Sequence, residues 1–324
     1  MNIILSNLQG TDLKGFCALR GLGELTPEQV LQHAPEALIT LDIGGMLAAR
    51  LSLWWRNVPD YPGERLGVIG HYSAINAEVA DQILESACLE LTRHGCTLAV
   101  GPMDGSTWRR YRLLTERGTE PPFFLEPDNP DDWPSHFEAQ GFAPLARYYS
   151  ALNDDIRRPW PLPSQAGDGF TLRLLDPADM EQELHHLWGV ARHAFASNFL
   201  YSPIEESEFL SLYRPLLPQV RPEFVLIAEQ AHSPVAFCFA VPDLLQARRG
   251  VSVDTLVIKT IAVLPDYQNQ GLGTLLIARV NEAAAQLGMR RSIHALMHEA
   301  NPSRRIGKGF MREFRRYTLY ARRL

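Results

Sequence analysis

The sequence predicts a mixed α/β protein in which helices cover sheets, and three observations carry this prediction. Short runs of β-branched and aromatic residues alternate with amphipathic helical stretches along most of the chain. One stretch, Thr255–Gly288, reads as a strand, a glycine-bearing turn and a helix. The order of elements in the first half also recurs in the second. With 324 residues and 46% hydrophobic content, the chain is long enough for two domains with real cores.

Charge and cysteine usage exclude several classes of protein. A net charge of −6 argues against a dedicated nucleic-acid-binding protein. Basic residues still gather near the C-terminus, as a solvated face or a local anion site: Arg304, Arg305, Lys308, Arg312, Arg315, Arg316, Arg322 and Arg323. The cysteines lack metal-ligand spacing and are expected to be free thiols: Cys17, Cys88, Cys96 and Cys238. We see neither a signal peptide nor a membrane span, and we expect a cytoplasmic protein without a metal.

The first half reads mainly as strands around one long helix. Residues up to about 20 give no clear element. Beyond them we expect strands at 37–42, 46–55, 65–74 and 96–100, helices at 80–94 and 106–114, a loop at 120–134, and a last strand from Gly141 through Leu152. Gly44–Gly45 joins the first two strands in the manner of a hairpin. Residues 153–169 are rich in proline and glycine and read as a linker.

The second half begins with a strand at 170–174. Asp176 or Asp179 is expected to cap a helix that runs to about His193. We then expect a helical region at 205–217, a hairpin of strands at 224–229 and 234–241, the Thr255–Gly288 unit, a strand at 290–298, a short helix from Pro302 and a final strand at 316–321. We therefore divide the chain into a first domain (1–152), a linker (153–169) and a second domain (170–324).

The Thr255–Gly288 stretch has the features of an anion site. Its strand ends at Pro265, Gly271 and Gly273 follow in a polar turn, and apolar residues then recur at helical spacing up to Gly288. Glycines let the backbone approach a ligand closely, and the first N–H groups of a helix point at an anion with the positive end of the dipole behind them. This pattern predicts that a phosphate-bearing ligand binds here.

A weak internal repeat supports two related halves. Residues 133–142 align without a gap over residues 301–310, with Pro, Ser, Gly and Phe coinciding, and Tyr149 and Tyr317 follow at equal distances. The halves differ at the turn. Where the second half has residues 268–273 with two glycines, the first has Asn76–Asp81 with no glycine and two carboxylates. We expect a phosphate to be repelled there.

The element order and the Gln268–Gly273 turn together resemble the GNAT superfamily of N-acetyltransferases, in which a Q/R-x-x-G-x-G/A turn binds the pyrophosphate of acetyl-CoA. Gln268, Gly271 and Gly273 stand at those positions. A Rossmann fold would need a third glycine, which is absent. The resemblance implies two GNAT-like domains, each with a mixed, mostly antiparallel sheet flanked by helices. It covers the second half well, and residues 37–152 as a degenerate copy that lacks the first strand, its helices and the pyrophosphate loop.

The resemblance also assigns residues to acetyl-CoA. The strand residues Ile261 and Val263, on either side of Ala262, would donate N–H groups to the thioester and the pantetheine arm. Asn301 would contact that arm or simply cap a helix, and Arg304 would approach the adenosine phosphates. The backbone amides from Gln270 to Thr274 would hold the pyrophosphate. The loop residues expected to bind the cofactor are Gln268, Asn269, Gln270, Gly271, Leu272, Gly273 and Thr274.

The proton-transferring groups depart from the family pattern. Arg305 occupies the position at which many members carry a tyrosine acid, and arginine stays charged. It could stabilise the departing thiolate. The strand 255–264 carries Lys259 and no carboxylate to act as base. His294 and His298 are the remaining candidates, expected on one face of their strand, with Glu299 behind them.

The resemblance implies direct transfer of an acyl group from acetyl-CoA to the amine of a small molecule, with the second half catalytic. Asn198, Tyr201 and Glu205 lie where family members shape the acceptor pocket. Two alternatives remain. One is N-acetylation of a protein or peptide, and the other is a non-catalytic acyl-CoA-binding or scaffold protein. The acceptor, the acyl chain length and the oligomeric state cannot be derived from the sequence.

Overall fold

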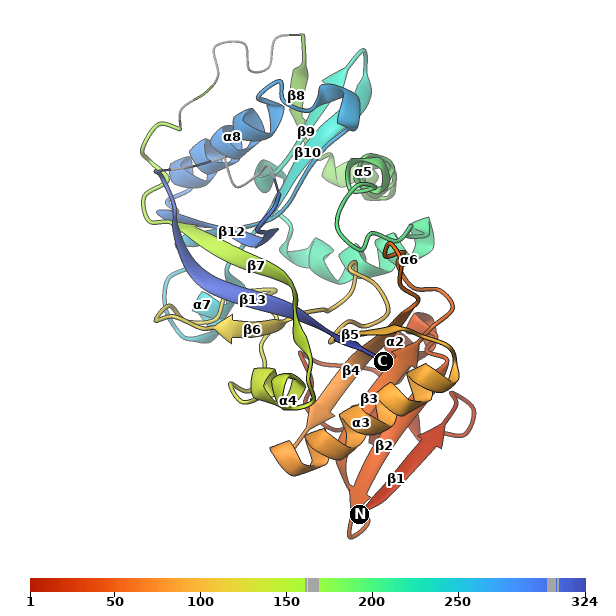
Figure 1. Ribbon diagram of the computed structural model, residues 1–324. Helices are drawn as coiled ribbons and strands as arrows, with labels where there is room; N and C mark the ends of the chain where they lie inside the picture. Colours follow the sequence, from red (N-terminus) through yellow and green to blue (C-terminus); the bar gives the residue numbers. More distant parts are fainter. Residues whose placement is uncertain (161, 163–168, 302–306, 308) are drawn as a thin grey trace.

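The computed structural model describes the whole chain apart from residues 161, 163–168, 302–306 and 308. Its strands form one continuous, largely antiparallel sheet that runs through both halves (Figure 1). The strand order is β1-β2-β3-β4-β5-β13-β7-β12-β11-β10-β9-β8, with β6 paired to β13. No helix of the described residues has the length and apolar character that crossing a membrane requires.

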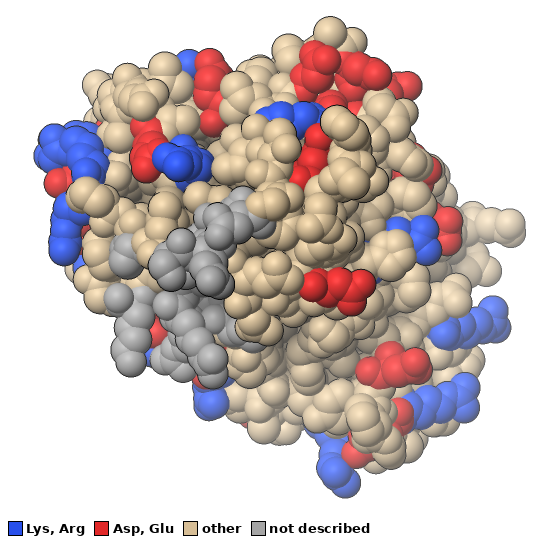
Figure 2. Space-filling model, turned by 90° about the horizontal axis from the view of Figure 1, so that it is seen from above, with Lys and Arg blue, Asp and Glu red and all other residues tan. Residues whose placement is uncertain are grey.

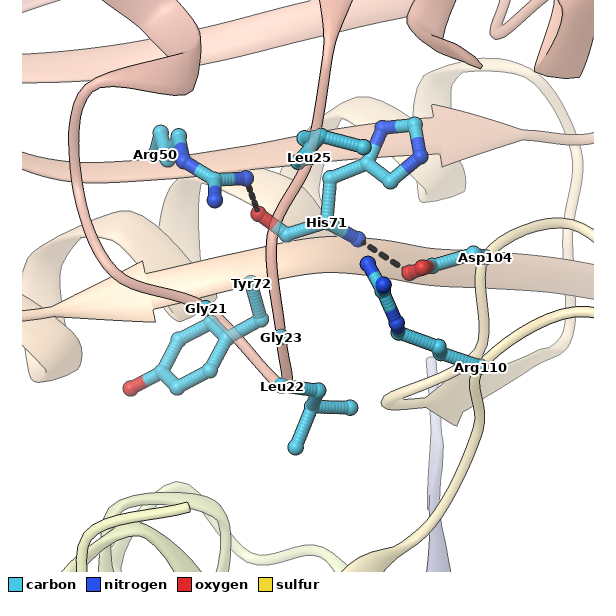
Figure 3. A pocket seen from close by; sticks show the side chains of 9 residues that line it. All are labelled: Gly21, Leu22, Gly23, Leu25, Arg50, His71, Tyr72, Asp104 and Arg110. Atoms are coloured by element: carbon cyan, nitrogen blue, oxygen red, sulfur yellow. Dashed lines mark hydrogen bonds between the residues drawn. The ribbon is translucent and has the colours of Figure 1, made fainter. Parts of the chain in front are cut away.

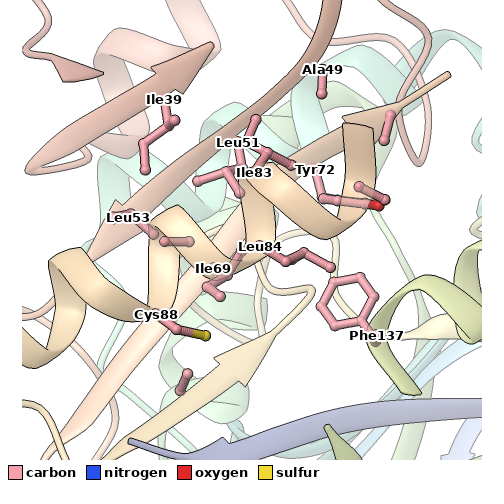
Figure 4. Close-up of a cluster of buried hydrophobic side chains, with 14 of the residues drawn as sticks. Ile39, Ala49, Leu51, Leu53, Ile69, Tyr72, Ile83, Leu84, Cys88 and Phe137 are labelled. Atoms are coloured by element: carbon pink, nitrogen blue, oxygen red, sulfur yellow. The ribbon is translucent and has the colours of Figure 1, made fainter. Parts of the chain in front are cut away.

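The first half contributes strands that pack against helices on both faces. Its strands are β1 (Asn2–Ser6), β2 (Ala37–Ile43), β3 (Met46–Trp54), β4 (Leu66–Ala74), β5 (Leu98–Gly101), β6 (Leu113–Glu116) and β7 (Ala143–Asn153). Its helices are α1 (Leu13–Cys17), α2 (Pro27–His33), α3 (Ala77–Arg93) and α4 (Trp133–Ala139). Ile39 faces the core under α3 and α4 (Figure 4), whereas the preceding residue, Leu38, points to the opposite face and packs with α1 and α2.

The second half repeats this arrangement. Its strands are β8 (Thr171–Leu174), β9 (Val225–Gln230), β10 (Ser233–Pro242), β11 (Thr255–Val263), β12 (Arg291–His298) and β13 (Arg312–Arg323). Its α-helices are α5 (Met180–Ala194), α6 (Glu206–Tyr213), α7 (Leu244–Arg248) and α8 (Leu272–Gln286). Short 3-10 helices lie at Pro177–Asp179, Arg214–Gln219, Pro222–Phe224 and Pro265–Tyr267. Helices α5 and α6 cover one face of the sheet, and α8 covers the other.

The two halves share their last strands. β7, which ends the first half, pairs with β12 of the second, and β13, which ends the second, pairs with β5 of the first. β7 and β13 also pair with each other in the middle of the sheet (Figure 1). The sheet therefore passes from one half to the other at β13 and β7. The strand that follows the linker, β8, lies at the edge of the sheet. That residues 1–152 and 170–324 behave as separate domains stays a proposal.

Arginines near the C-terminus tie this shared strand to acidic partners. Arg315 bonds to Glu126 at 2.9 Å with both side chains buried. Arg322 pairs with Glu85 at 2.8 Å, across the two halves. Arg312, Arg316 and Arg323 also have carboxylate partners. Basic and acidic side chains are interspersed on the face seen in Figure 2. The described arginines of this run thus serve as ion-pair partners and do not gather into an anion site.

Three sequence expectations were wrong. Residues 106–114 do not form a helix, because Leu113 and Leu114 are buried in β6 against β13. The first half does not lack the opening strand and helices: β1 pairs with β2, and a Thr26–Gln29 capping box begins α2. β1 is short and mostly exposed, which leaves it without an apolar periodicity to detect. β13 begins four residues earlier than expected, at Arg312.

Candidate active site

The sheet of the second half opens between β11 and β12. The two strands are parallel partners from Thr255–Arg291 to Ile258–His294, and no further pair follows. Beyond this point Lys259–Val263 continues beside β10, while the later part of β12 continues beside β7. The facing edges of the two strands therefore carry main-chain groups that are not used in a ladder between them.

The register of β11 shows which main-chain groups face this opening. The N–H of Leu264 donates to the carbonyl of Val235 in β10 at 2.9 Å. Successive N–H groups alternate in direction along a strand, so that of Ala262 also points to β10. Those of Ile261 and Val263 then point to the opening. This is the orientation that a donor to a thioester or an amide in the opening requires. Because the N–H of Ala262 points to β10, Ala262 could contribute only by packing.

The turn after β11 presents the N-terminus of α8. Asn269 and Gly271 both have positive φ, at 62° and 77°, which suits Asn and Gly. The side-chain amides of Gln268 and Gln270 donate to the carbonyls of Val263 and Asp266, at 3.2 and 3.1 Å, and brace the turn from within. The first backbone hydrogen bond of the helix runs from the N–H of Leu275 to the carbonyl of Gly271. The N–H groups before Leu275 therefore have no carbonyl partner within the helix. The first turn contains no acidic residue.

A bulge separates the two candidate histidines. The register of β12 against β7 shifts between His294 and Met297, and Leu296 has a φ of 61°. His294 is 4% exposed, stacks on Trp160 at 5.7 Å and faces the α8 side. His298 instead contacts Phe199 from the α5–α6 connection. The expectation that both share a face was wrong, because a bulge shifts the alternation by one residue.

Neither histidine has the arrangement of a ready base. Burial lowers the pKa of His294 to about 4, and its Nε2 lacks a hydrogen-bond partner among the described groups. For His298, burial and then Arg112 lower the pKa. The N–H of Ala300 donates to His298 Nδ1 at 3.1 Å, which places the proton of the neutral ring on Nε2. His298 therefore offers a hydrogen-bond donor, and a base role for either ring stays a prediction.

Tyr213 is a residue that the sequence did not point to. It ends α6, is 4% exposed and stacks on Phe209 at 4.5 Å. Its hydroxyl lies 3.3 Å from Thr260 Oγ1 and accepts from Lys259 Nζ at the same distance. Tyr213 thus reaches the point at which β11 leaves β12. Tyr213 is not part of any sequence motif. Only the packing of α6 on the sheet places it beside β11.

The expected acceptor residues lie on the α5–α6 connection with unequal roles. Tyr201 donates its hydroxyl to the carbonyl of Arg192 at 2.8 Å and so closes the end of α5. Glu205 is exposed, and its carbonyl accepts the first backbone bond of α6 from Phe209. Asn198 is exposed within a turn. All three lie between the body of α5 and that of α6, and their contact with an acceptor stays a prediction.

Two other expected residues lie outside the described part of the chain: Arg304 and Arg305. Asn301 is described, is half-buried, and its N–H donates to the carbonyl of His298 at 2.9 Å. It therefore follows the open edge of β12 directly.

The comparisons with known proteins agree with this geometry. Residues 190–306 match the model of the acetyltransferase (GNAT) family. This stretch, which lies within the second half of the chain, is a GNAT acetyltransferase domain. The match includes the α5–α6 segment, the open strands, the glycine turn and α8. The matched part of the chain thus belongs to the GNAT family.

Relatives extend the likeness to the whole chain. A protein of Caulobacter vibrioides (strain NA1000 / CB15N) named bacterial ceramide synthase is 29% identical over 221 residues, which cover 63% of this chain and 56% of that protein. The chain thus spans little more than half of this relative. A GCN5-related N-acetyltransferase of Sphaerobacter thermophilus covers 99% of this chain and 95% of its own, with 13% identity and a TM-score of 0.52.

A tandem GNAT protein from the clavulanic acid biosynthesis pathway also has this fold, with 99% of this chain and 98% of its own covered, 12% identity and a TM-score of 0.54. The fold of this chain is therefore that of a tandem GNAT protein.

The first GNAT-like half differs where a ligand would bind. The residue before its α3 is Asn76, an N-cap whose side chain accepts from the N–H of Val79 at 3.1 Å. Glu78 adds a negative charge in the first turn. Beyond the last β4–β5 pair lies a small pocket, covered by the segment 21–25 (Figure 3). The N-terminus of α8 has no side-chain cap, whereas the corresponding helix of the first half is capped by Asn76.

That pocket is polar and electropositive. The backbone N–H of His71 donates to Asp104 Oδ1 at 2.6 Å, and the ring Nε2 of His71 lies 2.8 Å from His33 Nδ1. These three side chains bring possible metal-ligand atoms within 4.8 Å of one another. Burial, followed by three guanidinium groups, holds the pKa of His71 well below its usual range: Arg50, Arg109 and Arg110. The same three positive charges oppose a dication, so we do not assign a metal here.

Proposed function

We propose that this chain transfers an acyl group from acyl-CoA directly to the nitrogen of an amine, with the second half catalytic. The observation that carries the proposal is the opening between β11 and β12, with the N–H groups of Ile261 and Val263 directed into it and the α8 N-terminus beside it. A thioester in the opening would meet donors already in place, and such preorganised donors stabilise the charge that develops on a carbonyl oxygen during attack.

The residues that would hold acyl-CoA follow from the same geometry. The N–H groups of the turn and of the first turn of α8, from Gln270 to Thr274, would bind the pyrophosphate. Asn301, at the end of the open strand, would meet the pantetheine arm. Acyl-CoA supplies an activated acyl group and a thiolate leaving group, with acetyl as the simplest acyl chain.

The chain's own groups then act on the acceptor side. His298 offers Nε2–H to an oxygen or nitrogen near the opening, and Tyr213 of α6 offers its hydroxyl beside β11. The amine must lose a proton on attack, and water can carry it, because no described carboxylate lies on β11. A thiol has an ordinary pKa of about 8.5, so the leaving group needs little help from a strong acid.

The test is release of CoA from acetyl-CoA by the full chain with a panel of amines, alongside titration calorimetry with acetyl-CoA. Amine-dependent release above the rate of hydrolysis supports the proposal. Binding without amine-dependent release across the panel favours the non-catalytic acyl-CoA-binding alternative. If acetyl-CoA neither binds nor releases CoA, both the enzymatic and the non-catalytic hypotheses are rejected.

A long-chain amine is a second candidate acceptor, and two observations favour it. The Caulobacter vibrioides relative is named a ceramide synthase, and a ceramide is the amide of a long-chain amine. Partly exposed apolar side chains also border the core under α5 and α6: Trp108, Trp188, Phe195, Leu210 and Leu212. A series of alkylamines separates the candidates. A rise in kcat/KM with chain length supports the lipid acceptor, and a flat or falling series supports a small one.

A further inference from the structure

Lys259 occupies a special position on β11. Phe239 of β10 pairs with Thr260, and the next residue, Ala240, pairs with Ile258, so Lys259 is the extra residue of a β-bulge. It is also the first residue after the last β11–β12 pair. Bulges redirect side chains, and here both Lys259 and Thr260 reach the same tyrosine. The bulge therefore places an ammonium group at the mouth of the opening, on the face covered by α6.

An aromatic group holds this ammonium in place. Lys259 Nζ lies 4.5 Å from the centre of the Tyr213 ring and 3.3 Å from its hydroxyl. Tyr213 is itself fixed, because its ring stacks on Phe209 at 4.5 Å and meets Phe239 edge-on at 5.2 Å. A cation against a ring face is attracted to it but keeps its charge. Lys259 is thus oriented without being neutralised.

No carboxylate of the described residues forms an ion pair with Lys259. Two acidic side chains of α6 and β9 have arginine partners of their own. Glu208 of α6 pairs with Arg109 at 2.6 Å, and Glu229 of β9 pairs with Arg173 at the same distance. An amine acceptor arrives as an ammonium ion, and a second positive charge at the acyl site disfavours it. An acceptor that brings its own negative charge reverses this effect.

We propose that the acceptor is an amine that carries an anionic group, a carboxylate or a phosphate, within a few bonds of its nitrogen, and that Lys259 binds this group. The inference rests on the proposed acyl transfer and adds the substrate class. The ammonium of Lys259 pairs with the anion, while the acceptor nitrogen lies toward Ile261 and the opening. Tyr213 keeps Lys259 in place and is a positioning residue in this arrangement.

The experiment compares pairs of amines that differ in the anion: glycine with glycinamide, and phosphoethanolamine with ethanolamine. CoA release from acetyl-CoA is measured with the full chain. The wild-type protein is expected to prefer the anionic member of each pair by about tenfold or more in kcat/KM, the scale of one partly exposed ion pair in a site. Lys259→Gln is expected to remove the preference, Lys259→Arg to keep it, and Lys259→Glu to invert it.

Two controls separate charge recognition from folding. Lys14→Gln changes an exposed lysine of the first half and should leave the preference unchanged. Each Lys259 variant should bind acetyl-CoA as the wild type does, since Lys259 is exposed and its contacts lie on the acceptor face.

The outcomes are distinct. A preference for the neutral members, or an equal loss on all amines in Lys259→Gln, overturns this inference while leaving acyl transfer intact. Absence of release with every amine, in a protein that does not bind acetyl-CoA, overturns the proposed function itself.

Discussion

Gly271 is the residue at which the cradle can be tested most sharply. Its φ of 77° and ψ of 0° place it in the left-handed region at the N-cap of α8. Any other residue there costs about 1–2 kcal/mol of backbone strain. Gly271→Glu adds a carboxylate at the site where the pyrophosphate of CoA is proposed to bind. Gly271→Gln has nearly the same shape and the same strain but no charge.

The difference between these two variants isolates the electrostatic effect. A carboxylate about 6 Å from a doubly charged pyrophosphate, at an effective dielectric constant of about 40–80, is repelled by about 1.5–3 kcal/mol. We therefore expect Gly271→Glu to bind CoA about 10- to 100-fold more weakly than Gly271→Gln in titration calorimetry.

Gly288→Glu is the matched control. Gly288 also has a positive φ, 87°, but lies beyond the other end of α8 with no atom within 4 Å of an added Cβ. It should lose stability and keep its affinity for CoA. Equal affinities of the Glu and Gln variants at position 271 would refute the cradle.

Three further predictions address stability and architecture. Burial lowers the pKa of His294 to about 4, so on acidification this histidine is protonated in the unfolded chain at a higher pH than in the folded one. The free energy of unfolding should therefore fall from pH 6.5 towards pH 4, by about 2 kcal/mol at pH 5 from this residue alone. His294→Gln should flatten the corresponding change in the urea midpoint, and an unaltered pH dependence would contradict the buried neutral ring. Arg109→Gln should leave Glu208 without its 2.6 Å partner, cost about 2 kcal/mol, and speed amide exchange in α6 more than in α8; uniform exchange would contradict a local role. A fragment of residues 170–324 should neither fold nor bind CoA, because β7 is missing between β12 and β13. A fragment of residues 143–324, which contains β7, should recover part of the circular dichroism signal. A stable fragment 170–324 that binds CoA would show that the shared strands are dispensable.

The local chemistry of the cradle could be read from the sequence, because it depends on neighbours in the chain. Pro265, the glycines and the helical periodicity lie within one segment, and backbone preferences decide its shape. The continuity of the sheet could not be read in this way. β7 and β13 resemble any other strand, and their exchange between the halves depends on contacts between residues 143–153 and 312–323, which are far apart in the chain.

The acceptor side shows why site residues were harder to predict. His294 and His298 are four residues apart, and strand alternation places them on one face unless a residue is inserted between them in the ladder. Leu296, with a φ of 61°, supplies that irregularity, and leucine gives no warning of it. In the sequence, Lys259 marks only a strand that has no carboxylate to act as base. Its role depends on a second bulge and on Tyr213, which comes from α6 by packing alone.

The central claim is that one half of the chain carries an acyl-CoA cradle and the other does not. Titration calorimetry of the full chain with acetyl-CoA tests it most directly. The α8 N-terminus is open, whereas that of α3 is capped by Asn76 and bears Glu78. We predict saturable binding with one acetyl-CoA per chain. Two equivalent sites, or no binding at all, would contradict the account.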